Sequence, residues 1–209
     1  MDKENSKKYW ENYYSKNRQF NTPSGFAEFV LPFLKEDSVL IELGCGNGRD
    51  CFYFEKNRGL KIHALDQCTD EITYLAELNS SKISFHASDF TKFAEVKDFD
   101  YVYSRFTLHS VSSADEENTF EWVSEGLSKN GLFFIEVRST NDELYGVGEQ
   151  IGEHEFISDH YRRFVVMDEM IANAKKHNLV PIYALQSKGL APHKQFDPEV
   201  IRLILGKAH

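Results

Sequence analysis

The feature that most constrains the fold of this chain is an apolar run that leads directly into closely spaced glycines. Residues 39–50 read V-L-I-E-L-G-C-G-N-G-R-D, with Gly44, Gly46 and Gly48 at alternate positions. A run of Val, Leu and Ile that ends in a tight glycine loop is typical of a buried parallel strand followed by a helix. Glycine in such a loop accepts a positive φ angle and lets a ligand lie against bare backbone. Arg49 stands where a dinucleotide-binding fingerprint has its third glycine, so the spacing does not match an NAD site.

Strand and helix signals alternate along the rest of the chain. Short apolar runs recur at roughly 20-residue intervals and predict strands over residues 38–43, 61–66, 82–86, 99–104 and 131–137. Helical segments are predicted between and after them, over residues 49–57, 69–78, 115–127 and 168–177. Two last strands are predicted over residues 179–187 and 200–205. This alternation predicts an α/β fold with a doubly wound, Rossmann-like parallel sheet and helices on both faces.

The composition limits the classes of partner. The chain has 209 residues, which suits one domain over residues 1–209. Its 24 basic and 33 acidic side chains give a net charge of −9. An acidic chain is a poor candidate for sequence-independent binding to nucleic acid or to an anionic membrane, because both favour basic patches. We therefore expect a small-molecule partner, no nucleic acid and no membrane, and a monomer or a homodimer.

The cysteines and the amino terminus bear on compartment and metal binding. Cys45, Cys51 and Cys68 are odd in number and lack C-x-x-C spacing, which disfavours a disulfide framework or a zinc site. Reduced thiols and no metal are expected. The first residues, M-D-K-E-N-S-K-K-Y-W, lack the apolar core of a signal peptide, and no apolar run reaches about 18 residues. These features predict a cytoplasmic protein.

Two segments lie outside the alternating pattern. Residues 1–35 contain Tyr9, Trp10, Tyr13 and Tyr14, whose spacing suits one face of a helix. That helix either covers a ligand as a lid, the interpretation we favour, or packs on the core. A second helix is predicted over residues 24–34. Separately, a stripe of aromatic side chains is interpreted as core: Phe20, Phe26, Phe29 and Phe33. Residues 138–166 form a long connection, which is usually functional or flexible when it has no regular structure.

Polar residues stand at the carboxyl ends of four successive predicted strands. Glu42, Asp66, Asp89 and Ser104 occupy these ends, and ligands of open α/β sheets bind along that edge. Each residue also has an ordinary interpretation: Asp66 as an acid before a helix, and Asp89 as a turn aspartate. The glycine loop alone is also compatible with a turn that binds nothing. The alignment of these four residues with the glycine loop on one edge favours a ligand site. In such a site, Glu42 can face a cationic group.

The motifs G-C-G-N-G-R-D, A-L-D, S-D-F and Y-S-R-F-T-L-H-S resemble those of class I S-adenosylmethionine (SAM)-dependent methyltransferases over nearly the whole chain. The resemblance implies a seven-stranded sheet closed by an antiparallel carboxyl-terminal hairpin, with SAM as the cofactor. It implies that Asp66 binds the ribose, that Asp89 binds adenine and that Ser104 and Arg105 line the methionine side. The implied cofactor-binding set is Tyr9, Trp10, Glu42, Gly44, Cys45, Gly46, Arg49, Asp50, Asp66, Gln67, Ser88, Asp89, Phe90, Ser104 and Arg105.

A narrower resemblance concerns the carboxyl-terminal part of the chain. The segment S-K-G-L-A-P-H-K, followed by D-P-E-V-I-R-L-I-L, resembles small-molecule methyltransferases of surface-polysaccharide synthesis. Methyl transfer from a sulfonium is a direct displacement that depends mainly on holding the two reactants in line. A hydroxyl acceptor needs a general base, whereas an anionic phosphoryl oxygen needs positioning and charge neutralisation.

Arginines and histidines between residues 105 and 163 are the candidates for the acceptor side. Arginine presents a planar fork of donors that matches phosphate, so a converging set predicts O-methylation of a small anionic acceptor such as a phosphoryl, phosphoramidate or sugar-phosphate group. The candidate catalytic residues are His109, His160 and Arg105. The candidate acceptor-binding residues are Arg138, Tyr145, His154, Tyr161, Arg162 and Arg163.

The alternatives remain open at the level of sequence. Arg162 and Arg163 could instead be solvated, or be paired with Asp159, Glu153 or Glu155. His109 could be a core histidine that is hydrogen-bonded to the backbone. A second hypothesis is methylation of an uncharged hydroxyl or other small metabolite with a histidine base. A third is a SAM-binding sensor without catalysis. A nucleic-acid methyltransferase is disfavoured, because S-R-F-T replaces the N/D-P-P-Y/F tetrapeptide of amino-methylating DNA enzymes.

Overall fold

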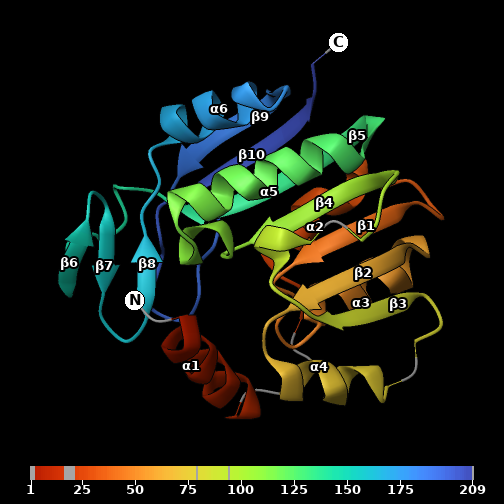
Figure 1. Cartoon of the computed structure of the whole chain (residues 1–209), viewed down its shortest axis with the longest axis horizontal. Coiled ribbons are helices and arrows are strands. Elements are labelled where there is room, and N and C mark those ends of the chain that lie inside the picture. Colours follow the sequence, from red (N-terminus) through yellow and green to blue (C-terminus); the bar gives the residue numbers. More distant parts are fainter. Residues whose placement is uncertain (1–2, 17–21, 79, 94, 209) are drawn as a thin grey trace.

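A seven-stranded sheet forms the centre of the protein in the computed structural model, which describes residues 3–16, 22–78, 80–93 and 95–208. The strand order is β3-β2-β1-β4-β5-β10-β9 (Figure 1). The strands are β1 (Val39–Leu43), β2 (Lys61–Asp66), β3 (Ile83–Ala87), β4 (Phe99–Arg105), β5 (Leu127–Arg138), β9 (Leu179–Ser187) and β10 (Val200–Lys207). Strands β1 to β5 run parallel, and β10 is antiparallel to both β5 and β9. The predicted fold is confirmed, including the closing antiparallel pair.

The strand order reverses between β2 and β4, which both pair with β1 in parallel. Such a reversal opens a crevice at the carboxyl ends of the strands, because the connections on either side leave in opposite directions. The glycine loop of residues 44–48 follows β1 at this point. The sheet topology therefore places the predicted ligand loop at the edge where ligands of such sheets bind.

Helices cover both faces of the main sheet (Figure 1). They are α1 (Lys3–Lys16), α2 (Gly25–Val30), α3 (Arg49–Arg58), α4 (Thr69–Ala76), α5 (Ser113–Gly126) and α6 (Met167–Lys176), with short 3₁₀ turns η1 (Leu31–Phe33), η2 (Phe90–Lys92) and η3 (Leu108–Ser110). On one face α5 and α6 bury Phe120 and Met170 against the strands. On the other face α2 and α3 bury Phe26 and Phe54. These two apolar clusters hold the sheet rigidly beneath its carboxyl edge.

The interpretation of the phenylalanine stripe as core was partly wrong. Phe26 is buried and Phe29 is partly buried, but Phe33 is 42 % exposed. Helix α2 ends at Val30, and Pro32 lies in the 3₁₀ turn η1, whose three-residue period rotates Phe33 away from the α-helical stripe. Phe20 lies outside the described residues.

Residues 138–166 have regular structure of their own. They contain a separate antiparallel sheet with the order β6-β7-β8, made of β6 (Glu149–Gly152), β7 (Glu155–Ile157) and β8 (Tyr161–Arg163). Figure 1 shows this small sheet beyond the carboxyl edge of the main sheet, with α1 between it and α4. The long connection is thus a folded insertion that forms one side of the space above the glycine loop.

Candidate active site

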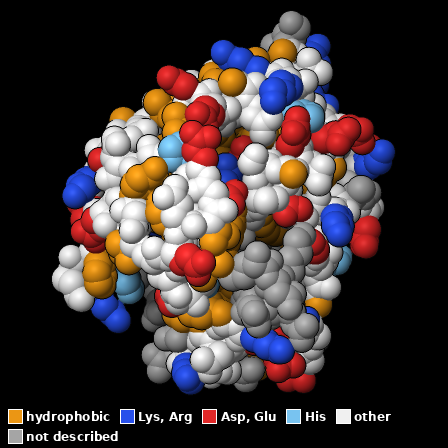
Figure 2. Space-filling model, turned by 60° about the vertical axis from the view of Figure 1, so that its left-hand side comes forward, with side chains coloured by type: hydrophobic (Ala, Val, Ile, Leu, Met, Phe, Trp, Pro, Cys, Tyr) orange, Lys and Arg blue, Asp and Glu red, His pale blue; other side chains and the backbone are white. Residues whose placement is uncertain are grey.

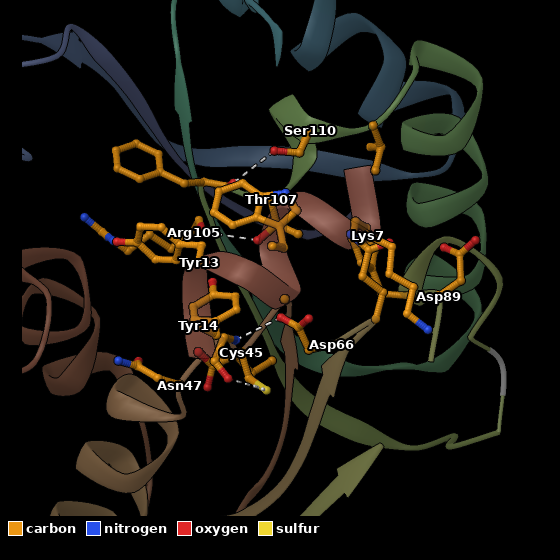
Figure 3. Close-up of a pocket in the computed structure, with 18 of the residues that line it drawn as sticks. Lys7, Tyr13, Tyr14, Cys45, Asn47, Asp66, Asp89, Arg105, Thr107 and Ser110 are labelled. Carbon is orange, nitrogen blue, oxygen red and sulfur yellow. Dashed lines mark hydrogen bonds between the residues drawn. The ribbon is translucent and has the colours of Figure 1, made fainter. Parts of the chain in front are cut away.

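One cavity of about 1130 Å³ lies along the carboxyl edge of the main sheet. It is lined by the glycine loop, the ends of β2, β3 and β4, helix α1 and the small sheet. Figure 3 shows Tyr14 of α1 beside Cys45 of the glycine loop and Asp66 of β2. Its size suits a drug-sized ligand together with a second small molecule. On the face shown in Figure 2, acidic, basic and hydrophobic side chains are mixed, and the described residues there form no basic patch.

The glycine loop needs glycine at two of its positions. Gly44 and Gly46 have φ angles of 69° and 54°, in the left-handed region that side chains disfavour. A Cβ atom at Gly44 would lie 2.7 Å from Cγ2 of Thr107, and one at Gly46 would lie 2.4 Å from the hydroxyl of Tyr14. Both distances are too short for a real contact, so bare backbone is required here for steric as well as conformational reasons.

Asp66 connects the glycine loop to the end of β2. Its Oδ2 accepts a hydrogen bond from the Gly46 N–H at 2.9 Å, and its Oδ1 accepts one from the Cys68 N–H at 2.9 Å. The carboxylate is buried and lines the cavity. Asp66 therefore fixes the shape of the loop while it presents its charge to a ligand. Its role in ribose binding stays a prediction.

Glu42 presents a carboxylate oxygen that has no hydrogen-bond partner among the described residues. The side chain is 4 % exposed, it lines the cavity, and the unpartnered atom is Oε2. Burial raises the pKa of Glu42 well above its usual range, and the nearby Asp50 carboxylate adds to the shift. A buried acceptor without a partner is costly, and a ligand ammonium group would satisfy it.

Asp50 also lines the cavity, but its hydrogen bonds are used inside the protein. Its carboxylate accepts from the N–H and the hydroxyl of Ser24, at 2.8 and 2.7 Å, and from the hydroxyl of Tyr103 at 2.8 Å. These bonds connect the start of α3 to the N-cap of α2 and to β4. Asp50 thus stabilises the cavity lining by holding α2, α3 and β4 together.

Helix α1 lies across the cavity and supplies Lys7, Trp10, Tyr13 and Tyr14 to its lining. Tyr14 reaches down to Gly46, as its close approach to that glycine shows (Figure 3). Tyr9 was also expected to face the cofactor, but it turns away. Its hydroxyl donates to Oδ2 of Asp159, in the insertion, at 3.0 Å. Tyr9 therefore lies on the side of α1 that faces the insertion.

Most residues implied to bind the cofactor line this one cavity. Besides Glu42, Asp50, Asp66 and Trp10, they are Gly44, Cys45, Gly46, Arg49, Gln67, Ser88, Asp89, Phe90 and Arg105. Tyr9 and Ser104 do not line it. Ser104 points into the protein, is fully buried, and its hydroxyl has no partner among the described residues. Because successive side chains of a strand face opposite sides, the neighbouring Arg105 reaches the cavity where Ser104 does not.

Cys45 and Asp89 illustrate how the cavity wall is built. Burial raises the pKa of the Cys45 thiol, so the thiol stays protonated, in agreement with its interpretation as a small non-nucleophilic group. Asp89 accepts from the N–H and the hydroxyl of Thr91, at 3.1 and 2.7 Å, and so caps η2. Asp89 thus combines its turn role with a place in the cavity lining.

The expected convergence of arginines on the cavity was wrong for three of them. Arg138 pairs with Asp142 at 2.7 Å, Arg162 pairs with Asp159 at 2.7 Å, and Arg163 pairs with Glu116. None of these arginines lines the cavity. A guanidinium that is largely removed from water needs a carboxylate beside it, and the fold supplies one to each. For Arg162 the partner is one that the sequence had suggested.

The histidines expected to act as bases also lie outside the cavity lining. His109 is buried, and its Nδ1 accepts from the N–H of Arg138 at 3.2 Å, so it is a core histidine bonded to the backbone. Burial, together with the positive charge of Arg138, keeps its pKa well below the usual range. His154 is 2.8 Å from the hydroxyl of Tyr145, and neither residue reaches the cavity.

His160 packs beneath α1. Its ring centroid lies 4.4 Å from that of Tyr9 and 4.9 Å from that of Trp10. Burial lowers the pKa of His160 to about 4, and the positive charge of Arg162 contributes, so the ring is neutral at pH 7. The side chain therefore connects the insertion to α1, and it does not face the space where a ligand would lie.

Tyr161 is the one member of the predicted acceptor-binding set that lines the cavity. Burial raises the pKa of its hydroxyl, and a hydrogen bond to the Glu155 carboxylate adds to this. Several other lining residues were not predicted: Lys7, Asn47, Thr69, Phe106, Thr107, Ser110, Val111, Ser112, Asp115, Ile151, Glu155, His193 and Lys194. For His193 and Lys194 the only sequence signal was the S-K-G-L-A-P-H-K segment, which was noted without a role.

Two features of the described residues bear on other classes of function. Within that part of the chain, no helix is long and apolar enough to span a bilayer. No group of three or more His, Cys, Asp or Glu side chains is arranged there to hold a metal ion.

The mostly parallel seven-stranded sheet, its antiparallel closing pair and the glycine-lined cavity define the methyltransferase class of Rossmann-like fold. The chain belongs to the methyltransferase domain family, whose model matches residues 34–185. It is 28 % identical over 130 residues to phosphoethanolamine N-methyltransferase from Plasmodium falciparum. That alignment covers 61 % of this chain and 48 % of the relative, so the chain spans about half the length of that curated relative.

Solved structures share the fold at low sequence identity. A TehB-like SAM-dependent methyltransferase from Corynebacterium glutamicum superposes with a TM-score of 0.71 at 20 % identity, covering 95 % of this chain and 98 % of that one. The 1,6-didemethyltoxoflavin-N1-methyltransferase from Burkholderia thailandensis, solved with its substrate and S-adenosylhomocysteine, gives a TM-score of 0.69 at 18 % identity. There the coverage is 88 % of this chain and 77 % of the other.

Proposed function

We propose that this SAM-dependent methyltransferase acts on a small molecule that binds beside SAM in the same cavity. The observation that carries the proposal is that thirteen of the fifteen residues implied to bind the cofactor line one cavity, from the glycine loop to the end of β4. The cavity is large enough for a nucleoside donor and a small acceptor together. SAM, when bound, supplies an electrophilic methyl group on a positively charged sulfur.

The residues present fit such a donor. The unpartnered Oε2 of Glu42 suits a ligand ammonium group, and the buried Asp66 carboxylate suits ribose hydroxyls. Asp89 and Phe90 lie together at the end of β3, where a polar edge and a flat ring face suit adenine. The protein contributes chiefly by holding donor and acceptor at near-attack distance, an effect worth about 7–11 kcal/mol in well-oriented systems.

The acceptor is proposed to lie on the opposite side of the cavity, against a group of residues here called the acceptor wall. It consists of Asp115, Ile151, Glu155, Tyr161, His193 and Lys194. With Arg138, Arg162 and Arg163 held elsewhere, Lys194 is the lysine of this wall available to an anionic group. Glu155 provides a carboxylate on the same wall. A small acceptor with a phosphoryl group and a nucleophilic oxygen or nitrogen matches this pair of charges.

The name of one relative supports this acceptor class. The Plasmodium falciparum relative is named for phosphoethanolamine, a compound with both a phosphate and an amine. The carboxyl-terminal resemblance to methyltransferases of surface-polysaccharide synthesis adds sugar phosphates and phosphoramidates as O-methylation candidates. An uncharged hydroxyl acceptor is the second hypothesis. Its base would be Glu155 or His193, because the other candidate histidines lie outside the cavity lining.

The test is a screen for S-adenosylhomocysteine release with phosphoethanolamine, ethanolamine, phosphorylated and nucleotide-linked sugars, and free sugars. With a phosphorylated acceptor we expect Lys194→Met to raise the acceptor KM about tenfold and to leave the KM for SAM unchanged. Lys176→Met is the matched control, since Lys176 lies on α6 away from the cavity lining. With an uncharged acceptor, Glu155→Gln should lower kcat instead. Tight SAM binding without turnover of any acceptor would support the sensor hypothesis.

A further inference from the structure

Arg163, the last residue of β8, connects the small sheet to residues that follow β4. Its Nε donates to the carbonyl oxygen of Val111 at 3.2 Å, and its Nη2 donates to that of Leu108 at 3.2 Å and pairs with the Glu116 carboxylate. The side chains of Arg163 and Glu116 are only 12 % and 3 % exposed, so little water competes for these contacts. The three partners are 47–55 residues away in sequence. One side chain thus joins the folded insertion to the main sheet.

The segment that Arg163 contacts runs from η3 into the first turn of α5. It supplies four residues of the cavity lining: Ser110, Val111, Ser112 and Asp115. The two carbonyl groups that accept from Arg163 belong to the first residue of η3 and to the residue that follows η3. Ser112 then caps α5, since its hydroxyl accepts from the Asp115 N–H at 3.1 Å. The bonds from Arg163 therefore fix the backbone at both ends of η3, directly before α5 begins.

The small sheet places Arg163 next to two other residues of the cavity lining. Arg163 lies opposite Glu155 in the β7–β8 pair, and Tyr161 is two residues before Arg163 on the same strand. Side chains that are opposite each other, or two apart on one strand, share a face of the sheet, so all three project from one face. Glu155 and Tyr161 line the cavity, and the Tyr161 hydroxyl makes one long hydrogen bond, at 3.5 Å, to the carbonyl oxygen of Val111. The shorter bonds from Arg163 hold the same two surfaces together.

The contacts of Arg163 require a guanidinium group. Arginine presents five N–H donors in a rigid plane, so Nε and Nη2 serve two carbonyl groups and a carboxylate at once. A lysine ammonium is a single nitrogen on a flexible chain and cannot hold the same three acceptors in fixed directions. Glu116 is itself held, because Asn173 of α6 donates to its Oε1 at 3.2 Å. Buried carbonyl groups need donors, so loss of the guanidinium would leave the backbone of η3 less firmly held.

We propose that Arg163 is a positioning residue of the acceptor wall, which sets the distance between Asp115 on one side and Glu155 and Tyr161 on the other. Arg163 acts through the backbone of η3 and does not touch the acceptor. The inference rests on the proposed function, because it takes the acceptor to bind against this wall. The carboxylates that suit the donor lie on β1 and β2, so loss of Arg163 should impair binding of the acceptor more than binding of SAM.

The first test is steady-state kinetics of the full-length protein, measured as S-adenosylhomocysteine release. The acceptor used is phosphoethanolamine or, if the protein does not methylate it, the compound turned over fastest in the acceptor screen. Arg163→Lys keeps the positive charge beside Glu116 and loses the fork of donors. We expect this variant to raise the acceptor KM about tenfold and to change kcat and the KM for SAM by less than about twofold. All variants are assayed well below the temperature at which the least stable one unfolds.

Glu116→Gln is the matched control for stability. The glutamine oxygen still accepts from Arg163, so the two carbonyl bonds stay in place while the buried charge pair is lost. We expect this variant to unfold at a lower temperature and to keep the acceptor KM within about twofold of wild type. An equal rise of the acceptor KM in Glu116→Gln and Arg163→Lys would show a general effect of lower stability and would overturn the positioning role.

The second test is hydrogen exchange of the S-adenosylhomocysteine complex, which needs no acceptor. Arg163→Lys should speed exchange of the amides of residues 108–112 by about tenfold and leave exchange of the glycine loop, residues 44–48, unchanged. A higher acceptor KM without faster exchange at residues 108–112 would mean that Arg163 contacts the acceptor itself. That result would overturn the positioning role.

Two further outcomes separate this inference from the proposed function. If wild type methylates an acceptor and Arg163→Lys has the same acceptor KM, the positioning role is overturned and the proposed function stands. If wild type binds S-adenosylhomocysteine and methylates none of the compounds in the screen, the proposed function is overturned, and the positioning role with it.

Discussion

Replacing Glu42 by glutamine should weaken donor binding and stabilise the ligand-free protein at the same time. Glu42 is buried, one of its oxygens has no hydrogen-bond partner among the described residues, and Asp50 and Asp66 increase the negative charge around it. Only Arg49 opposes this charge among the groups that shift its pKa by charge. The cavity thus presents a carboxylate oxygen that a ligand ammonium group would satisfy. Glu42→Gln removes the destabilising charge and also the charge-assisted hydrogen bond to such a ligand.

The expected magnitudes follow from that geometry. Loss of a charge-assisted hydrogen bond should weaken S-adenosylhomocysteine binding by about tenfold to a hundredfold, equivalent to about 1.4–2.8 kcal/mol. Relief of like-charge repulsion should raise the free energy of unfolding by about 1 kcal/mol, or roughly 2–4 °C in Tm for a chain of this size. The gain depends on pH. Because burial raises the pKa of Glu42 in the folded state, wild type loses stability as the pH rises from about 4.3, the unfolded value, through the folded pKa.

The assay combines thermal unfolding between pH 4 and pH 8 with calorimetric titration of S-adenosylhomocysteine. The stability advantage of Glu42→Gln should be small at pH 4 and should increase as the pH rises toward 8. Glu116→Gln is a matched control, because Glu116 is equally buried but is paired with Arg163 and hydrogen-bonded by Asn173. That variant should lose about 3 kcal/mol of stability and keep its affinity for the nucleoside.

Two results would contradict the proposed role of Glu42. One is a Glu42→Gln variant that binds S-adenosylhomocysteine within twofold of wild type, since Glu42 would then not contact the headgroup. The other is a variant less stable than wild type at pH 8, which would mean that Glu42 is already satisfied in the ligand-free protein.

Three further predictions concern the contacts around the cavity. Tyr9→Phe removes the hydrogen bond to Asp159 that connects α1 to the insertion. The affinity for S-adenosylhomocysteine should fall a few-fold, and the free energy of unfolding should change by less than about 1 kcal/mol. Unchanged affinity in calorimetry would exclude a role for this contact. As the pH falls from 6.5 to 4, the His160→Phe variant should lose less stability than wild type. The reason is that the pKa of His160 is lowered to about 4 in the folded protein, so the unfolded chain takes up the proton at a higher pH than the folded one does. Parallel pH profiles of the two proteins in thermal unfolding would contradict this. Asp50→Asn weakens the bonds from Ser24 and Tyr103 and should lower Tm by roughly 5 °C, with an unchanged Tm as the opposing result.

Much of the fold was predictable because its signals are local. The strand β1 and its glycine loop depend on residues adjacent in sequence: an apolar run, then positions where only a left-handed backbone fits. The ends of the helices and strands were predicted less accurately than their existence. Strand β5 begins at Leu127, four residues before its predicted start, because residues 127–130 extend it without the apolar run that marked the prediction. The turn at Pro32 similarly removed Phe33 from the core.

The part of the cavity lining that comes from the strand ends was also largely predictable, for a topological reason. Residues at the ends of successive parallel strands meet at one edge whatever the helices between them contain, so Asp66 and Asp89 had to lie near the glycine loop. What the sequence left open there was the direction of single side chains. Ser104 faces the interior and Arg105 the cavity, and Tyr9 faces the insertion and Trp10 the cavity.

Local sequence signals were enough to predict the class of fold, the edge of the sheet at which the cavity lies and the presence of many charged groups downstream of the glycine loop. Which of those charged groups are available to a ligand depends on how the chain packs. Arg163 pairs with Glu116 from a helix 47 residues away in sequence, and β10 brings the 188–199 loop, with Lys194, to the cavity. An arginine next to a carboxylate is neutralised by it, which is why Arg138, Arg162 and Arg163 are not available to a ligand. The distances between these charged groups arise only from packing, because spacing along the chain does not determine them.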